Sequence, residues 1–195
     1  MTALPTEKTE KEKMLAGEPY VAGDAELVAE RLHARRVLHD FNGAVPGEEA
    51  QYLRALAGFF GAFGEGTVVM APFQCDYGYN IRIGRNGFVN YNCVFLDCAP
   101  ITLGDHVQIA TGVQLLTAAH PLDAALRRGP EYALPITIGD DVWIGGGAIL
   151  LPGVTVGEET VIGAGSVVTR DLPPRVVAAG NPCRVLRAID EPRRG

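Results

Sequence analysis

Residues 136–172 read ITIGDDVWIGGGAILLPGVTVGEETVIGAGSVVTRDL and repeat with a period of six. Large aliphatic side chains stand at every sixth position: Ile138, Ile144, Leu150, Val156, Ile162 and Val168. The fourth residue after each of these is Val142, Ala148, Val154, Thr160, Ser166 and Leu172. Each hexad therefore has two positions that we expect to face inward. Small residues that favour a tight corner commonly follow the aliphatic one: Gly139, Gly145, Gly157, Gly163 and Thr169.

The six-residue period predicts a parallel β-helix, because three short strands joined by corners make one coil of a triangular prism. Stacked coils pair their strands about 4.8 Å apart and align the aliphatic residues in columns inside the prism. The same phase occurs upstream at Ile83, Val89, Leu103, Ile109 and Leu115. Two interruptions divide the phases, near residues 98–102 and at 117–137. The spacing predicts a mainly β fold but does not determine the hand of the coil.

The first part of the chain, from about residue 6 to 63, reads as helix. Leu27, Leu32, Val37 and Leu38 recur on one face, and Asp24 stands where an N-cap is expected. The pairs Asn42-Gly43 and Pro46-Gly47 break the pattern, and a further helix is predicted over residues 51–63. Beyond residue 66 the helical period disappears.

Composition and charge narrow the function classes. The chain has 195 residues, of which 47% are hydrophobic, and a formal net charge of −6. A globular fold is expected, and neither nucleic acid nor an anionic membrane is an expected partner. The four cysteines form no Cys-x-x-Cys pair, which favours free thiols, no metal site and a cytoplasmic location. No export signal or membrane-spanning stretch is expected.

Several segments resemble the hexapeptide-repeat sugar O-acetyltransferases, the maltose and galactoside acetyltransferase family. They are Glu12–Gly17, Cys75–Ile81, Asn90–Cys93, Thr117–Pro121, Ala179–Arg184 and the repeats from residue 136 onward. The resemblance implies a left-handed parallel β-helix at 66–195 with a helical cap at 1–65, a protruding loop at 117–134 and a C-terminal tail. The run Cys75–Ile81 is similar to the maltose branch, whereas the galactoside branch has Ser at position 76 and an acid at position 98.

His120 is the candidate general base. Of the four histidines, His33 and His39 fall in the helical part and His106 in a Gly-Asp-His corner, whereas His120 opens the long interruption, where functional residues are commonly placed. Position alone is weak evidence, but His120 matches the family's catalytic histidine. Imidazole suits proton transfer from an alcohol at neutral pH. Asn90, otherwise a stacked corner residue, matches the family's transition-state contact, and direct transfer without an acyl-enzyme is expected.

The resemblance also assigns binding residues. For the sugar acceptor these are Arg31, Asp76, Asn90 and Asp97, although Asp76 and Asp97 read equally well as turn residues. For acetyl-CoA they are Trp143, Gly146, Ala164, Thr169, Arg170, Arg184 and Arg187. The last two arginines suit phosphate groups. Gly146 and Arg170 depart from relatives, which have Ser and Lys there.

The resemblance further implies a product acetylated on the 6-hydroxyl of a maltosyl, glucosyl or galactosyl unit. It also implies a homotrimer with sites between subunits. The alternatives are a hexapeptide acetyltransferase for serine or an antibiotic, and a non-catalytic scaffold. A zinc carbonic anhydrase on the same prism needs three histidines, whereas the repeats supply only His106 and His120.

Overall fold

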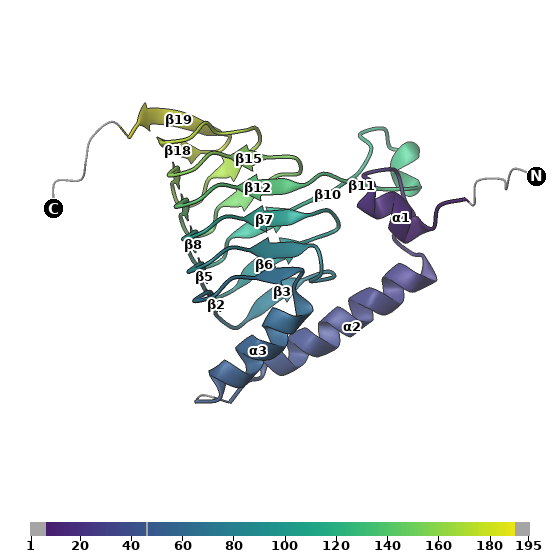
Figure 1. Cartoon of the computed structure of the whole chain (residues 1–195). Helices are drawn as coiled ribbons and strands as arrows, with labels where there is room; N and C mark the ends of the chain where they lie inside the picture. Colours follow the sequence, from purple (N-terminus) through teal and green to yellow (C-terminus); the bar gives the residue numbers. More distant parts are fainter. Residues whose placement is uncertain (1–6, 46, 190–195) are drawn as a thin grey trace, which may run out of the picture.

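The computed structural model describes residues 7–45 and 47–189. Its main body is a prism of three sheets, parallel except for the last strand, that rises from the two longer helices at one end to the C-terminal hairpin at the other (Figure 1). The first sheet holds β1 (Ala62–Phe63), β4 (Ile81–Ile83), β7 (Ile101–Leu103), β12 (Ile136–Ile138) and β15 (Thr155–Val156). The second holds β2 (Val68–Val69), β5 (Phe88–Val89), β8 (Gln108–Ile109), β13 (Trp143–Ile144), β16 (Val161–Ile162), β18 (Val176–Gly180) and β19 (Cys183–Ala188). The third holds β3 (Phe73–Cys75), β6 (Cys93–Leu96), β9 (Gln114–Leu116), β14 (Ile149–Leu150) and β17 (Val167–Val168).

The register confirms the predicted coil. Ile138 pairs with Val156, Ile144 with Ile162 and Leu150 with Val168, each eighteen residues along the chain. All twelve predicted inward positions of these hexads are buried, including the polar Thr160 and Ser166. The prediction of a β-helix from the hexad pattern is therefore confirmed.

The coils nearer the N-terminus are longer than the pattern alone indicates. There the partners are twenty residues apart, as in Ile83 with Leu103 and Val89 with Ile109. The extra residues lie in the corners 76–80 and 97–100, where the chain passes from the third sheet to the first. The segment 117–135 leaves the prism at the same edge, which we call the loop edge. Its outgoing and returning arms pair as β10 (Ala118–Ala119) and β11 (Tyr132–Ala133), with a short 3-10 helix, η1 (Leu126–Arg128), between them.

Three helices form the cap: α1 (Glu10–Leu15), α2 (Ala25–Asn42) and α3 (Glu49–Phe59). Asp24 caps α2 as predicted, since its side chain accepts a hydrogen bond from the Glu26 amide. The predicted helix over 51–63 is wrong at its end, because α3 stops at Phe59 and Ala62–Phe63 already form β1. The prediction that Leu32 shares the buried face is also wrong, because this residue is 46% exposed. The buried stripe of α2 is Leu27, Ala34, Leu38 and Phe41.

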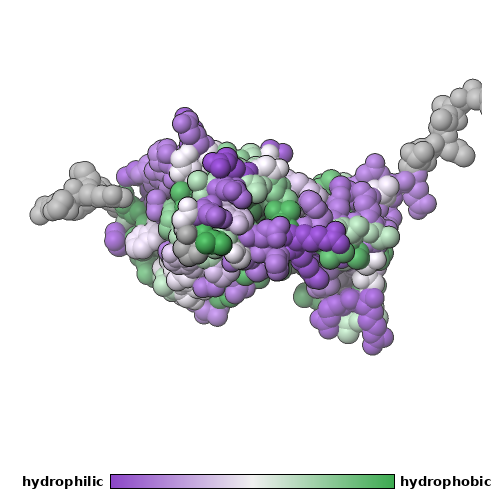
Figure 2. All heavy atoms as spheres, turned by 90° about the horizontal axis from the view of Figure 1, so that it is seen from below, coloured by the Kyte–Doolittle hydropathy of each residue, from purple (hydrophilic) through white to green (hydrophobic). Residues whose placement is uncertain are grey.

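Two apolar cores hold these parts together. The larger core fills the prism and extends to Leu38, Phe41 and Leu56 of the cap. The smaller core joins α1, α2, the loop edge and the base of the loop through Met14, Tyr20, Leu27, Tyr77, Cys98, Ala99 and Ala133. Seen from the cap end, hydrophilic side chains cover most of the surface, with smaller hydrophobic patches between them (Figure 2).

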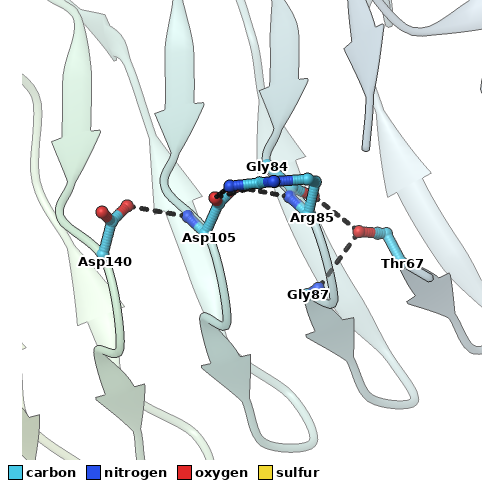
Figure 3. A network of polar contacts seen from close by, with 6 residues as sticks. All are labelled: Thr67, Gly84, Arg85, Gly87, Asp105 and Asp140. Atoms are coloured by element: carbon cyan, nitrogen blue, oxygen red, sulfur yellow. Dashed lines mark hydrogen bonds and ion pairs between the residues drawn. The ribbon is translucent and has the colours of Figure 1, made fainter. Parts of the chain in front are cut away.

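Glycines make the edge between the first and second sheets narrow. A Cβ built on Gly84 would lie 2.5 Å from the carbonyl carbon of Gly104, so only hydrogen fits between the coils. Side chains beside this column link successive coils (Figure 3). The Asp105 amide donates to Asp140 at 2.8 Å, the Arg85 amide donates to Asp105 at 2.7 Å, and the Thr67 hydroxyl donates to the Gly84 carbonyl at 2.6 Å. The hydrogen bonds at this edge hold successive coils in register, and the same register applies at the other two edges of the prism.

Candidate active site

Asp97 holds the first corner of the loop edge in place. Its carboxylate accepts hydrogen bonds from the backbone amides of Asp76 (3.0 Å), Tyr77 (2.8 Å) and Gly78 (2.7 Å). The residue is 0% exposed. Burial raises its pKa to about 6, although those three amides oppose the rise. Both oxygens are engaged inside the protein, so the turn interpretation of Asp97 fits its surroundings better than a direct sugar contact.

Asp76 lies on the outer side of the same corner and is half-buried. The Cys98 thiol donates to its Oδ2 at 3.4 Å. Burial raises the pKa of Asp76, while the Cys98 hydrogen bond and the Arg31 charge lower it. Arg31 reaches this corner from α2, donating to the Tyr77 hydroxyl and, at 2.6 Å, to the Ala22 carbonyl. The predicted acceptor residues Arg31 and Asp76 are thus brought together.

His120 stands at the end of β10 with its side chain 53% exposed. Its Nε2 lies 3.6 Å from Oε2 of Glu131, on the returning arm of the loop. Glu131 is held in turn by the cap: its Oε1 accepts a 2.5 Å hydrogen bond from the Tyr20 hydroxyl, and its backbone pairs with that of Tyr20. The imidazole therefore lies beside a carboxylate whose position is set by a buried tyrosine.

The sequence pattern does not identify Glu131 as a site residue. It falls inside the interrupted segment, where the hexad phase assigns no inward or outward direction. Nothing in the pattern separates it from Asp123 of the same loop. Only the return of the loop as an antiparallel arm puts it next to His120.

A second group of predicted residues lies on a different prism edge. Asn90, Gly146 and Ala164 follow β5, β13 and β16, where the chain passes from the second sheet to the third. We call this the asparagine edge. Asn90 is half-buried and its Oδ1 accepts from the Tyr91 amide at 2.8 Å. A Cβ on Gly146 would lie 3.3 Å from the Thr111 carbonyl oxygen, so the edge is also narrow here.

The other residues predicted to bind acetyl-CoA lie around these two edges. Trp143 projects from the second sheet and is 55% exposed. Thr169 and Arg170 are exposed and follow β17 on the loop edge, above His120. Arg184 and Arg187 lie on β19, which pairs with β18 as an antiparallel hairpin at the end of the second sheet. Both arginines are exposed, and each donates to a neighbouring backbone carbonyl of its own strand.

The two proposed catalytic groups are not brought together within one chain. The third sheet separates Asn90 on the asparagine edge from His120 on the loop edge. β6, which crosses that sheet between Asn90 and the loop edge, has four residues and alone spans about 13 Å at 3.3 Å per residue. A site that contains both groups therefore needs the loop edge of one copy to face the asparagine edge of another.

Other kinds of site find no support in the part of the chain that the structure describes. Within residues 7–45 and 47–189 there is no cluster of three His, Cys, Asp or Glu side chains able to hold a metal ion. No helix in those residues has the length and apolar character needed to cross a bilayer.

Comparison with known proteins adds independent information. Residues 13–64 match the maltose acetyltransferase hexapeptide capping motif, and residues 135–170 match the bacterial transferase hexapeptide of six repeats. The galactoside O-acetyltransferase of Escherichia coli K12 is 42% identical, over 92% of this chain and 89% of its own length.

Two solved structures superpose closely. A maltose O-acetyltransferase from Clostridium difficile 630 matches with a TM-score of 0.92 and 49% identity, covering 94% of this chain and 99% of that one. A hexapeptide-repeat acetyltransferase from Vibrio cholerae O1 biovar eltor, complexed with acetyl-CoA, matches with a TM-score of 0.87 and 42% identity, covering 94% and 100%.

Proposed function

The chain belongs to the hexapeptide-repeat acetyltransferases related to the maltose and galactoside O-acetyltransferases, and from that premise we propose that it transfers an acetyl group from acetyl-CoA to a sugar hydroxyl. One observation supports this most strongly. The loop leaves the prism at the same edge as the Asp76 corner, so an exposed imidazole and a set of hydrogen-bonding groups suited to hydroxyls share one surface.

His120 acts as the general base in this proposal. The sugar O–H proton moves to the imidazole as the oxygen forms a bond to the thioester carbonyl carbon. The tetrahedral intermediate then collapses, the C–S bond breaks, and the proton passes from the imidazolium to the CoA thiolate. The side-chain amide of Asn90 donates to the oxyanion. Glu131 orients the imidazole through its carboxylate 3.6 Å from Nε2.

Arg31 and Asp76 bind acceptor hydroxyls. Their groups lie on the loop edge next to the corner that Asp97 holds, and they offer both donors and an acceptor to a polyol. Asp97 contributes by fixing the backbone on which Asp76 stands. This assignment revises the direct contact expected for Asp97 from the resemblance.

Acetyl-CoA lies along the asparagine edge, against Trp143, Gly146 and Ala164. The relative from Vibrio cholerae complexed with acetyl-CoA supports this choice of co-substrate. The exposed Arg184 and Arg187 meet phosphate oxygens at the end of the second sheet, since arginine is well suited to such contacts. Thr169 and Arg170 approach the same ligand from the loop edge of the neighbouring copy.

A closed trimer brings the two parts of the site, the loop edge and the asparagine edge, together. Each loop edge then faces the asparagine edge of the next copy, and three equivalent sites form. The tip of the loop carries Leu122 and Leu126, which are 95% and 65% exposed in the single chain and are available to contact a neighbour. A monomer by light scattering would contradict this arrangement.

The direct test is mass spectrometry of glucose, maltose, galactosides and chitooligosaccharides after incubation with acetyl-CoA. Wild type is expected to add one acetyl group to one sugar class. His120→Ala is expected to lower kcat about 10²–10⁴-fold. His39→Ala, an exposed histidine on α2, serves as the control and should be unaffected. A chain that acetylates serine or an antibiotic but none of the sugars would contradict the acceptor assignment.

A further inference from the structure

Two carboxylates belong to the proposed site at the loop edge. Glu131 lies beside the His120 imidazole, and Asp76 lies on the first corner, where the charge of Arg31 acts on it. The two carboxylates are close enough for the charge of Glu131 to raise the pKa of Asp76. Like charges at such a distance repel one another. Their positions therefore depend on the groups that hold them from inside the protein.

Tyr20 holds Glu131. It belongs to the segment between α1 and α2, lies 111 positions before Glu131 in the sequence and is 0% exposed. Its hydroxyl donates to Glu131 Oε1 at 2.5 Å, while the backbones of the two residues exchange hydrogen bonds of 2.9 and 3.0 Å. These three hydrogen bonds fix both the backbone and the carboxylate of Glu131. Its other oxygen, Oε2, is the one that faces His120 Nε2.

Cys98 holds Asp76 in a similar way. The residue is 5% exposed, and its thiol donates to Asp76 Oδ2 at 3.4 Å. This hydrogen bond lowers the pKa of Asp76 and so favours its ionised form. The Cys98 thiol also interacts with the Tyr20 side chain, and both residues belong to the smaller core. The groups that hold the two carboxylates are thus neighbours.

Both donors keep their protons at neutral pH. Burial raises the pKa of Tyr20, and it raises the pKa of Cys98 to about 12. Each donor is therefore neutral and holds a carboxylate without adding a cation that would compete with the imidazolium or with a substrate hydroxyl. Because both side chains are buried, each acts through its carboxylate and not by contact with the acceptor.

We propose that Tyr20 and Cys98 are positioning residues with separate tasks. Tyr20 acts through Glu131 on proton transfer by His120, because the imidazolium that forms needs the carboxylate in a fixed place. Cys98 acts through Asp76 on binding of the acceptor. This inference rests on the proposed function and deepens it, since it connects a residue of the cap to the catalytic step. The two residues should therefore affect different kinetic constants.

Tyr20→Phe removes the hydroxyl and keeps the buried ring. With acetyl-CoA and maltose it should lower kcat about tenfold and change KM for maltose by less than about twofold, because the hydrogen bond to the carboxylate supports only the proton-transfer step. In a Glu131→Gln background the same substitution should lower kcat by less than about twofold, since Tyr20 acts through that carboxylate. Tyr79→Phe is the matched control, because the Tyr79 hydroxyl donates to a different carboxylate, that of Glu30, at 2.8 Å. Its kcat should equal that of the wild type.

Cys98→Ala removes the donor to Asp76, whereas Cys98→Ser replaces the thiol with a hydroxyl. Cys98→Ala should raise KM for maltose about 3–10-fold with kcat unchanged, and Cys98→Ser should restore a KM close to that of the wild type. The S–H stretching band of Cys98 should move to higher frequency in Asp76→Asn, because a neutral amide accepts more weakly than a carboxylate. Equal KM values for the Ala and Ser variants, or an S–H band that does not respond to Asp76→Asn, would overturn the role of Cys98.

Spectra without substrate separate this inference from the proposed function. In protein labelled with ¹⁵N-histidine, the ring-nitrogen shifts of His120, assigned by their loss in His120→Ala, should change in Tyr20→Phe and in Glu131→Gln but not in Tyr79→Phe. These changes without any acetylated sugar would refute the proposed function and support the positioning role. Acetylation of maltose with an unchanged kcat or unchanged His120 shifts in Tyr20→Phe would refute the positioning role and support the proposed function. Additive losses of kcat from Tyr20→Phe and Glu131→Gln would also overturn it.

Discussion

The carboxylate of Asp97 provides a quantitative test of how the loop edge is built. Three backbone amides lie 2.7–3.0 Å from its oxygens and favour the ionised form. Complete burial and the neighbouring charge of Asp76 oppose them, and burial is the larger effect, so the pKa rises from 3.8 to about 6. A group with a higher pKa in the folded state binds its proton more tightly there. Its contribution to stability therefore grows as the pH falls from about 6 toward 3.8 and is lost as the pH rises through 6.

The size of the effect follows from the shift. One pKa unit corresponds to about 1.4 kcal/mol, so lowering the pH from 7 to 4.5 should stabilise the wild type by about 2 kcal/mol through this group. Asp97→Asn does not titrate and lacks this contribution. The free energies of unfolding of both proteins, measured in urea at pH 7 and pH 4.5, isolate it, because titratable groups that do not interact with Asp97 affect both proteins alike. The advantage of the wild type over the variant should increase by about 2 kcal/mol at the lower pH.

Two results would refute this reasoning. A wild-type advantage that shrinks at pH 4.5 would mean that the amides outweigh burial and lower the pKa. A pH-independent difference, combined with weaker sugar binding by Asp97→Asn, would mean that the carboxylate is at the surface and contacts the acceptor.

Two further predictions concern the prism. Gly84→Ala should destabilise the fold by about 3 kcal/mol, because a Cβ would lie 2.5 Å from the Gly104 backbone and overpacking alone costs about 1–3 kcal/mol. Gly23→Ala is the control, because a Cβ there meets nothing within 4 Å. Equal urea midpoints for the two variants would contradict the narrow edge. All four cysteines are buried and their pKa values are raised by burial, that of Cys98 to about 12. A disulfide reagent at pH 8 should therefore label the folded protein slowly and all four thiols rapidly after unfolding, and rapid labelling of the folded protein would show that a thiol is accessible.

The prism was predictable because the side chains that face inward recur at a fixed six-residue spacing. Ile138 and Val156 are alike because they stack on one another, so sequence spacing maps directly onto register. The end of α3 was not predictable in this way. Phe63 continues the apolar helical pattern, yet it belongs to the first coil and pairs with Ile83 of the next coil, and this partner is distant in sequence.

The candidate site was only partly predictable for a related reason. His120 stood out because it interrupts the period, and the resemblance supplied Asn90, Arg31 and the residues for acetyl-CoA. Glu131 and the clamping role of Asp97 depend on which groups meet across corners and loops, which no spacing encodes. The cytoplasmic location and the roles of the individual site residues remain predictions.

Complementation between two inactive variants tests the central claim, that acetyl transfer occurs between neighbouring copies. His120→Ala and Asn90→Ala are each expected to be nearly inactive alone. Unfolded together in equal amounts and refolded, they form mixed trimers in which about a quarter of the sites pair an intact His120 with an intact Asn90 of the next copy. Recovery of about a quarter of the wild-type rate with acetyl-CoA and maltose is predicted. No recovery, with mixed trimers present by native mass spectrometry, would place both groups in one copy and contradict the account.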